Sequence, residues 1–199
     1  MKDFWDQRYD TNEFIYGIEP NEFFKDQLAS LKPGKIFLPA EGEGRNAVFA
    51  ANKGWDVYAV DQSEIARKKA LKLAEENNVS IHFDTALLQE YSYKHEFFDA
   101  AAIIFGHFSL EVRKIVHYNI SQSLKPGGVL ILEAFHKNQL EYDSGGPKDP
   151  EMLYTLRELF LDFPKLKIER ATKMKTILSE GNSHKGKAEI VRLVGIKVE

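Results

Sequence analysis

A glycine pair and an aspartate have the spacing of a nucleoside-binding site. Gly42 and Gly44 lie in the segment EGEGRNA (41–47), after a short apolar run and before a stretch with helical periodicity. Glycines at a strand-to-helix turn allow positive φ, or let a ligand approach more closely than a Cβ would permit. Asp61 follows about 20 residues later at the end of a second apolar run, where a carboxylate can accept hydrogen bonds from a ribose. The start of the helix adds unpaired N–H groups that suit an anionic ligand group.

The same segment also fits a dinucleotide site. Gly42, Gly44 and Ala47 match G-x-G-x-x-A, the fingerprint of NAD-binding proteins, so an NAD-dependent oxidoreductase is an alternative. Against it, the chain leaves little room for a separate substrate domain and has no evident Tyr-x-x-x-Lys pair. The glycines could also serve the turn alone. The segment contains, in order, a strand, the glycine pair, a helix, a second strand and a terminal acid. This order favours an adenosine site over a turn alone.

The elements that must position these residues alternate along the chain. Apolar runs between amphipathic stretches are typical of strands and helices around a mostly parallel sheet. The predicted strands are 36–38, 57–60, 80–83, 100–105 and 129–135, and the predicted helices are 45–53, 63–77 and 110–123. The sequence Lys125-Pro126-Gly127-Gly128 predicts a turn before the last of these strands.

Different elements flank this core. Two helices are predicted within residues 3–31. Residues 137–150 form a polar loop long enough to serve as a flap, and residues 151–161 form a helix. Residues 165–178 and 187–198 are expected to pair as an antiparallel hairpin, with EGNSHKG as its turn.

Composition narrows the function classes. A chain of 199 residues with 27 Lys and Arg against 30 Asp and Glu predicts one domain, with no general attraction for nucleic acid. The absence of cysteine excludes disulfides, thiolate metal sites and a cysteine nucleophile, and we expect no metal. The charged amino terminus and the lack of an apolar stretch of about 20 residues argue against a signal peptide and a membrane span. We expect a cytoplasmic protein whose oligomeric state is open.

Several segments resemble a known family. GEGRNAVFAANKGWDVYAVDQSEIARKKA resembles the first two strands of the class I S-adenosylmethionine-dependent methyltransferases, and LKPGGVLILEAF resembles their fifth strand with its turn. FWDQRY, YGIEPN, FGHFS and EGNSHKGKAEIVRL resemble small bacterial methyltransferases of the tellurite-resistance TehB type. The resemblance implies a three-layer, doubly wound, Rossmann-like α/β fold. Its seven-stranded, mostly parallel sheet would end in an antiparallel hairpin, and its cofactor would be S-adenosyl-L-methionine.

The resemblance also implies roles for segments and residues. Residues 1–199 would form one methyltransferase domain, with 1–31 as a helical lid, 36–135 as the cofactor-binding core and 165–198 as the hairpin. An aromatic face of the lid would attract the sulfonium. The expected cofactor contacts are Trp5, Tyr16, Gly42, Glu43, Gly44, Arg45, Asp61, Gln62, Leu87, Leu88 and Phe105.

The chain departs from the family at the glycine loop. Leu38 replaces the usual acid and Ala40 replaces the usual first glycine, while Pro39 lacks an N–H donor. Because alanine resists positive φ, we expect the loop to begin with a different turn geometry. Glu41 or Glu43 could replace the missing acid. These departures leave a non-catalytic module that binds S-adenosylmethionine as another alternative.

Methyl transfer from a sulfonium is an in-line displacement, so the protein mainly aligns the reactants and excludes water. If the acceptor loses a proton, a histidine near the methyl group is the best base at neutral pH. His107 and Tyr16 are the candidate catalytic residues, and His107, Glu133 and His184 are the candidate substrate contacts, although each could be structural. The segment FGHFS lacks the Asn/Asp-Pro-Pro-Tyr pattern of nucleobase and amide methyltransferases. We therefore expect a small acceptor: a thiol, a reduced metalloid oxyanion, an amine or a carboxylate.

Overall fold

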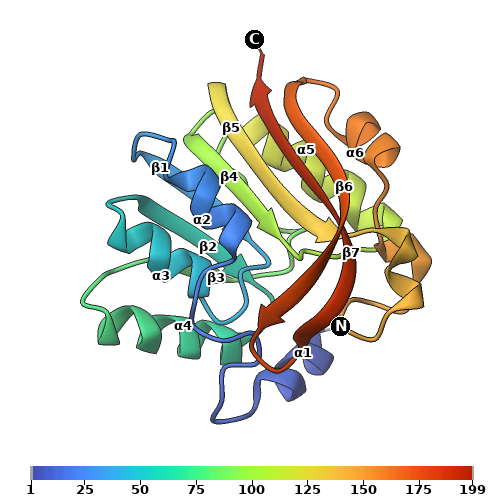
Figure 1. The fold of residues 1–199 in the computed structure, drawn as a ribbon. Coiled ribbons are helices and arrows are strands. Elements are labelled where there is room, and N and C mark those ends of the chain that lie inside the picture. The colour runs from blue at the N-terminus through green and yellow to red at the C-terminus, as the bar shows by residue number, and fades with distance from the viewer. Residues whose placement is uncertain (1, 199) are drawn as a thin grey trace.

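A seven-stranded sheet runs through the molecule and carries helices on both faces (Figure 1). The computed structural model describes residues 2–198, the side chain of Lys2 excepted. The strands are β1 Lys35–Pro39, β2 Asp56–Asp61, β3 His82–Thr85, β4 Phe98–Ile104, β5 Leu124–Phe135, β6 Leu166–Glu180 and β7 His184–Lys197. The helices are α1 Lys2–Tyr9, α2 Glu22–Leu28, α3 Arg45–Asn52, α4 Glu64–Glu76, α5 Leu110–Ser123 and α6 Leu156–Asp162, with short 3₁₀ helices η1 Lys137–Glu141 and η2 Pro150–Met152.

The sheet has the predicted doubly wound topology. Its strand order is β3-β2-β1-β4-β5-β7-β6, with parallel pairing through β5, while β7 is antiparallel to β5 and to β6. Strand β1 pairs with β2 on one side and with β4 on the other, so the strand order reverses there. In such sheets a crevice lies outside the carboxyl ends of the strands at the reversal. The exits of β1, β2 and β4 therefore meet at one place.

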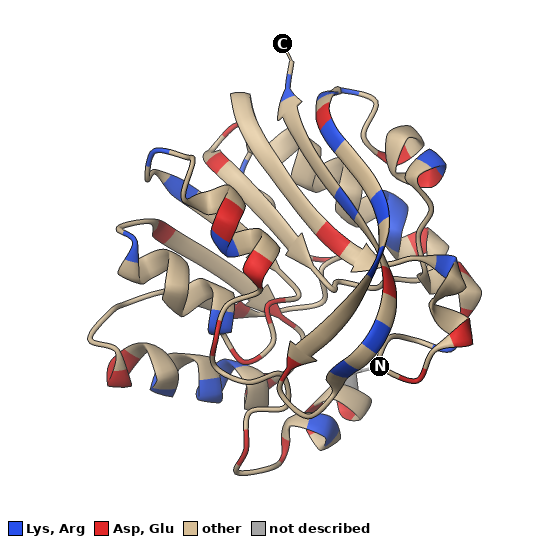
Figure 2. Ribbon diagram, in the orientation of Figure 1, with Lys and Arg blue, Asp and Glu red and all other residues tan. Residues whose placement is uncertain are grey.

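Two apolar cores hold the layers together. One sheet face packs against residues of α2, α3 and α4, and the other packs against α5 and α6. The central residues Ile36, Phe37 and Leu38 are 0% exposed, which explains why β1 is apolar without alternation. Figure 2 shows acidic and basic residues intermixed along the helices and along β6, in keeping with the small net charge.

The hairpin differs from the sequence prediction at its tip. Strands β6 and β7 continue to a turn of residues 181–183, so His184 begins β7 and pairs with Glu180. The prediction that His184 lies in the turn was wrong because the N-terminal segment orders the tip. The N–H of Asn182 donates to the carbonyl of Ile15 at 3.1 Å.

Three other boundaries also differ. The helix predicted at 151–161 begins only at Leu156, because Thr155 and Glu158 form a capping box there and Tyr154 bridges to His136 beside the sheet. The predicted turn at 125–128 lies inside β5 as an irregularity in the pairing with β4. Strand β3 begins two residues later than predicted.

Gly44 permits close packing of α3 on α4. Its φ is +87°, and a Cβ at this position would lie 2.6 Å from the Cβ of Ala70 and 2.9 Å from its Cα. The second glycine of the pair therefore serves helix packing through close backbone approach.

We predict that Gly44→Ala destabilises the fold more than Gly127→Ala does. Both glycines have strongly positive φ, +87° and +78°, so each substitution carries about 1–2 kcal/mol of backbone strain. A Cβ at Gly127 meets nothing within 4 Å, whereas the contact with Ala70 adds about 1–3 kcal/mol. Urea unfolding of both variants measures the difference, and equal losses of unfolding free energy would contradict the packing role.

Candidate active site

A cavity of about 700 Å³ lies at the carboxyl ends of β1, β2 and β4. Its volume is within the range of roughly 300–1,000 Å³ that is typical of small-molecule sites. Helix α1, the glycine loop, the exits of β2, β3 and β4, and the loop after β5 contribute to its wall. The predicted site residues that line it are Trp5, Tyr16, Gly42, Glu43, Arg45, Asp61, Gln62, Leu87, Leu88, Phe105, His107 and His184; Gly44 and Glu133 do not.

The glycine loop begins with an alanine in the left-handed region. Ala40 has a φ of +54°, so the expectation of a different turn geometry was wrong. This conformation is costly for a residue with a Cβ and persists where the surroundings impose it. Here the N–H of Glu41 donates to the carbonyl of Val60 at 3.3 Å, and the Glu41 carboxylate accepts the N–H of Ala47 at 2.7 Å. These two bonds fix the turn to β2 and to α3.

Glu41 places a half-buried carboxylate in the cavity wall. Burial raises its pKa to about 7, although the N–H of Ala47 and the charge of Arg45 favour the ionised form. Within residues 2–198, no cationic side chain forms an ion pair with Glu41. Glu43 differs, because it pairs with Lys69 at 2.5 Å and accepts the N–H of Ile15 at 2.8 Å. Glu41 is therefore the acid that is available to a cationic ligand group.

Asp61 joins the exits of β1 and β2. Its Oδ2 accepts the N–H of Gly42 and its Oδ1 accepts the N–H of Ser63, both at 2.9 Å. Burial raises its pKa to about 6, even though these N–H groups favour the charged form. A carboxylate has about four lone-pair sites, and the N–H groups of Gly42, Ser63 and Gln62 occupy at most three of them, so one stays free for another donor. Asp61 can thus accept a ribose hydroxyl group while it holds the glycine loop.

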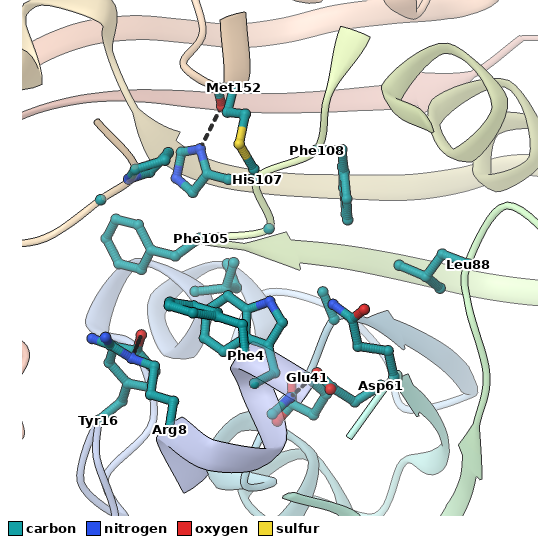
Figure 3. A pocket seen from close by; sticks show the side chains of 18 of the residues that line it. Phe4, Arg8, Tyr16, Glu41, Asp61, Leu88, Phe105, His107, Phe108 and Met152 are labelled. Carbon is teal, nitrogen blue, oxygen red and sulfur yellow. Dashed lines mark hydrogen bonds between the residues drawn. The ribbon is translucent and has the colours of Figure 1, made fainter. Parts of the chain in front are cut away.

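Helix α1 presents aromatic rings and a guanidinium. The rings of Trp5 and Tyr9 stack at 5.5 Å, and the Arg8 guanidinium lies 5.9 Å from the Trp5 ring and 5.7 Å from the Tyr16 ring. Figure 3 shows Arg8 beside Tyr16, and the Nε of Arg8 donates to the Tyr16 hydroxyl at 3.2 Å. No carboxylate in the described part of the chain forms an ion pair with Arg8. The cavity thus contains an unpaired cation and, in Glu41, an unpaired acid.

Glu133 lies outside the cavity in a buried polar network. It accepts the side-chain N–H groups of Asn21 at 2.6 Å and of Arg192 at 2.5 Å, and it is 1% exposed. Asn21 also donates to Glu180 at 2.8 Å. Glu133 therefore holds the N-terminal segment against the hairpin, and we do not retain it as a substrate contact.

His107 has partners for both ring nitrogens. Its Nδ1 lies 2.7 Å from the carbonyl oxygen of Met152, and its Nε2 accepts the N–H of Phe135 at 3.4 Å. Because a carbonyl can only accept, Nδ1 carries the proton and the ring is neutral. Burial lowers the pKa of His107 to about 4. This histidine supports the cavity wall, which weakens its candidacy as a base.

Within residues 2–198, only one ring nitrogen of His184 has a hydrogen-bond partner. Its Nδ1 lies 3.3 Å from the carboxylate of Glu180, which also accepts the Nη2 of Arg45 at 2.8 Å. Burial opposes ionisation of Glu180, but His184 and Arg45 outweigh it and lower the pKa of this carboxyl to about 2. The ring centroids of Tyr16 and Phe105 each lie 4.5 Å from that of His184. The pairing of β6 with β7 thus brings an acid and a histidine together at the cavity.

Sequence reasoning missed the wall formed after β5. Gly146, Pro147 and Met152 line the cavity, although the glycine-proline run predicted only a flap. Gly146 has a φ of +86°, and a Cβ there would lie 2.8 Å from the Phe135 ring. The glycine therefore lets the loop lie directly on the exit of β5. The apolar contacts from Phe4, Phe108 and Phe135 were also missed, because each depends on tertiary packing.

The described side chains contain no group of three or more His, Cys, Asp or Glu that could hold a metal ion. None of the described helices is long and apolar enough to cross a membrane.

The chain is similar to proteins of known structure. Residues 39–128 match a family model described as a methyltransferase domain. A structure from work on the conversion of a disulfide bond into a thioacetal group during echinomycin biosynthesis aligns over 100% of this chain and 92% of its own, with 16% identity and a TM-score of 0.82. TehB from Haemophilus influenzae aligns over 98% of this chain and 66% of its own, with 16% identity and a TM-score of 0.73. A SAM-dependent methyltransferase from Methanosarcina mazei aligns over 90% of this chain and 99% of its own, with 17% identity and a TM-score of 0.68. No curated protein matches the sequence.

We predict that Glu41→Gln removes part of the pH dependence of stability. The folded-state pKa of Glu41 is about 7, above the ordinary 4.5, so the folded protein binds this proton more tightly than the unfolded chain does. Stability should fall as the pH rises from about 4.5 through 7. Glutamine cannot ionise, yet its carbonyl can still accept the N–H of Ala47.

Chemical unfolding at pH 5 and pH 8 measures the effect. The wild type should lose more unfolding free energy than Glu41→Gln between these two values, by on the order of 2–3 kcal/mol. Identical pH slopes for the two proteins would show that this carboxyl is not perturbed by burial.

Proposed function

We propose that the protein is a class I S-adenosylmethionine-dependent methyltransferase that methylates a small molecule, since residues 39–128 match a family model described as a methyltransferase domain. The acceptor would enter the cavity at the exits of β1, β2 and β4. The NAD-dependent alternative has no support from the family model, which describes a methyltransferase.

The observation that carries this proposal is the set of polar groups in the cavity. Asp61 keeps a lone pair for a hydroxyl donor, Glu41 is an acid without a cation, and Arg8 is a cation without an acid. S-adenosylmethionine carries a ribose, an ammonium and a carboxylate, which need these three kinds of partner. We infer that Asp61 accepts a ribose hydroxyl, Glu41 the ammonium group and Arg8 the carboxylate.

The remaining cofactor contacts follow from the same cavity. Leu87 and Leu88 offer an apolar surface for the adenine, next to Gln62. The rings of Trp5 and Tyr16 offer faces that attract a sulfonium. Gly44 is not retained as a contact, since it acts through helix packing.

S-adenosylmethionine supplies a methyl group on a good leaving group, so the protein's task is alignment in a water-free site. Burial raises the pKa of Tyr16, whose hydroxyl accepts the N–H of Arg8. This tyrosine therefore remains neutral, and we propose that it positions the sulfonium and accepts no proton.

We further propose that residues 1–31 act as a lid on a single domain with its core at 36–135 and its hairpin at 165–198. The Nζ of Lys69 donates to the carbonyl oxygens of Thr11 and Glu13 at 3.1 and 2.6 Å, and the hydroxyl of Ser63 donates to Asp6 at 2.6 Å. These polar contacts fasten the first part of the segment to α4 and its N-cap, whereas Asn21 fastens the later part to Glu133 and Glu180. Opening of the first part would leave the sheet pairing intact.

Titration calorimetry with S-adenosylhomocysteine and with NADH tests the proposal. We expect binding of S-adenosylhomocysteine alone. Asp61→Ala should weaken that binding by about 1.5–3 kcal/mol through lost charge-assisted hydrogen bonds. Asp84→Ala, which removes an exposed carboxylate on β3, is the matched control and should leave the affinity unchanged. Binding of NADH without S-adenosylhomocysteine would reject the proposal, and unchanged affinity in Asp61→Ala would remove Asp61 from the site.

A further inference from the structure

We propose that the methyl acceptor is a neutral thiol or phenol on an apolar body, and that His184, oriented by Glu180, takes the proton that it loses. The inference rests on the proposed function and names the acceptor class for the same site. It also assigns the proton acceptor to the hairpin and not to the exit of β4.

The cavity is apolar away from its polar wall. Figure 3 shows Phe108, His107 and Met152 on the side opposite Glu41 and Asp61, with Phe105 between them. This acceptor end is completed by apolar side chains, among them Val112, Phe135 and Pro147. Such a surface favours an apolar, preferably aromatic, acceptor body.

Charged groups near the acceptor end are already paired. Arg45 bonds Glu180 at 2.8 Å, and Lys148 pairs with Asp143 at 2.9 Å. Asp149 accepts the N–H of Glu151 at 2.9 Å. Arg8 lies beside Tyr16 in Figure 3, where the proposed function assigns it to the donor carboxylate.

An oxyanion or carboxylate acceptor would therefore lose its hydration beside a buried cation, Arg45, that is already paired, and only the exposed Lys148 would remain as a counter-charge. Burial of an unpaired charge is strongly unfavourable, and a neutral acceptor avoids this cost. The charge distribution thus favours thiols and phenols over metalloid oxyanions and carboxylates.

His184 offers a hydrogen-bond acceptor to such a molecule. Because its Nδ1 faces the Glu180 carboxylate, Nδ1 carries the ring proton and the lone pair lies on Nε2. His184 lines the cavity, and its Nε2 forms no hydrogen bond with residues 2–198 and is not among their enclosed, unpartnered atoms. Both nitrogens of His107, in contrast, are engaged. His184 is therefore the cavity histidine that can receive a proton.

Bonds, proton and charge all balance in the proposed methyl transfer to the acceptor. The acceptor sulfur or oxygen bonds to the methyl carbon as the bond from that carbon to the donor sulfur breaks, and the electron pair stays on the donor sulfur. The S–H or O–H proton passes to Nε2 of His184 and later leaves to water. One positive charge is lost at the sulfonium as one forms on the imidazolium, beside Glu180. Burial, Arg45 and Arg8 all lower the pKa of His184, so Glu180 is needed to hold that charge.

Two thiols of different acidity test the proton transfer. Benzyl mercaptan is protonated at neutral pH, whereas 4-nitrothiophenol is already ionised. We expect His184→Gln to slow methylation of benzyl mercaptan by about 100-fold and to slow that of 4-nitrothiophenol far less. Both rates come from one preparation, so any loss of folded protein cancels in their ratio.

His107→Gln is the matched control, and it should change the two rates by the same factor. Equal slowing of both thiols by His184→Gln would overturn the role of His184 as proton acceptor.

A panel of acceptors tests the class. Wild-type protein with S-adenosylmethionine is offered benzyl mercaptan, 4-ethylphenol, selenite and benzoate, and binding of S-adenosylhomocysteine is measured alongside. We expect methylation of the thiol or the phenol and none of selenite or benzoate. Two results would overturn this inference and leave the proposed function standing. One is a preference for selenite or benzoate, and the other is a lack of product from both the thiol and the phenol while S-adenosylhomocysteine still binds. Failure to bind S-adenosylhomocysteine would overturn the proposed function and this inference with it.

Discussion

The carboxylate of Asp61 accepts backbone N–H groups from two neighbouring strand exits, and the cavity depends on this interaction. Through Gly42 it holds the glycine loop after β1, and through Ser63 it holds the start of α4. The loop needs such restraint because Ala40 adopts a conformation that favours glycine. Glu41 completes the restraint by binding the first turn of α3. The buried Asp61 and the half-buried Glu41 thus shape the loop, and both line the cavity.

A second polar network lies beside the cavity. Asn21 links Glu133 in β5 with Glu180 in β6, and Glu180 also accepts a hydrogen bond from Arg45 of α3. The network joins the N-terminal segment, the sheet, the hairpin and the helix after the glycine loop. Because buried polar groups are costly unless all are satisfied, this arrangement fixes the hairpin tip in one position. The orientation of His184 is a consequence of that position.

The local parts of the site could be predicted from the sequence, and the long-range parts could not. The glycine pair and Asp61 follow from one strand-helix-strand unit with characteristic spacing. The partnership of Glu180 with His184 depends on the turn length between two long strands, which composition does not determine. The partners of Glu133 come from Asn21 and Arg192, far away in the chain, so its structural role had no sequence signal. The start of α6 did have a sequence signal, because Thr155 and Glu158 have the spacing of a capping box.

The central claim is that two strand exits, shaped by two acids, hold an adenosine-bearing methyl donor. A crystal structure with S-adenosylhomocysteine bound tests it most directly. Our account predicts the ribose hydroxyls within hydrogen-bonding distance of Asp61, with the ligand's ammonium group next to Glu41. A ligand bound elsewhere on the molecule, or a ribose turned away from Asp61, would contradict it.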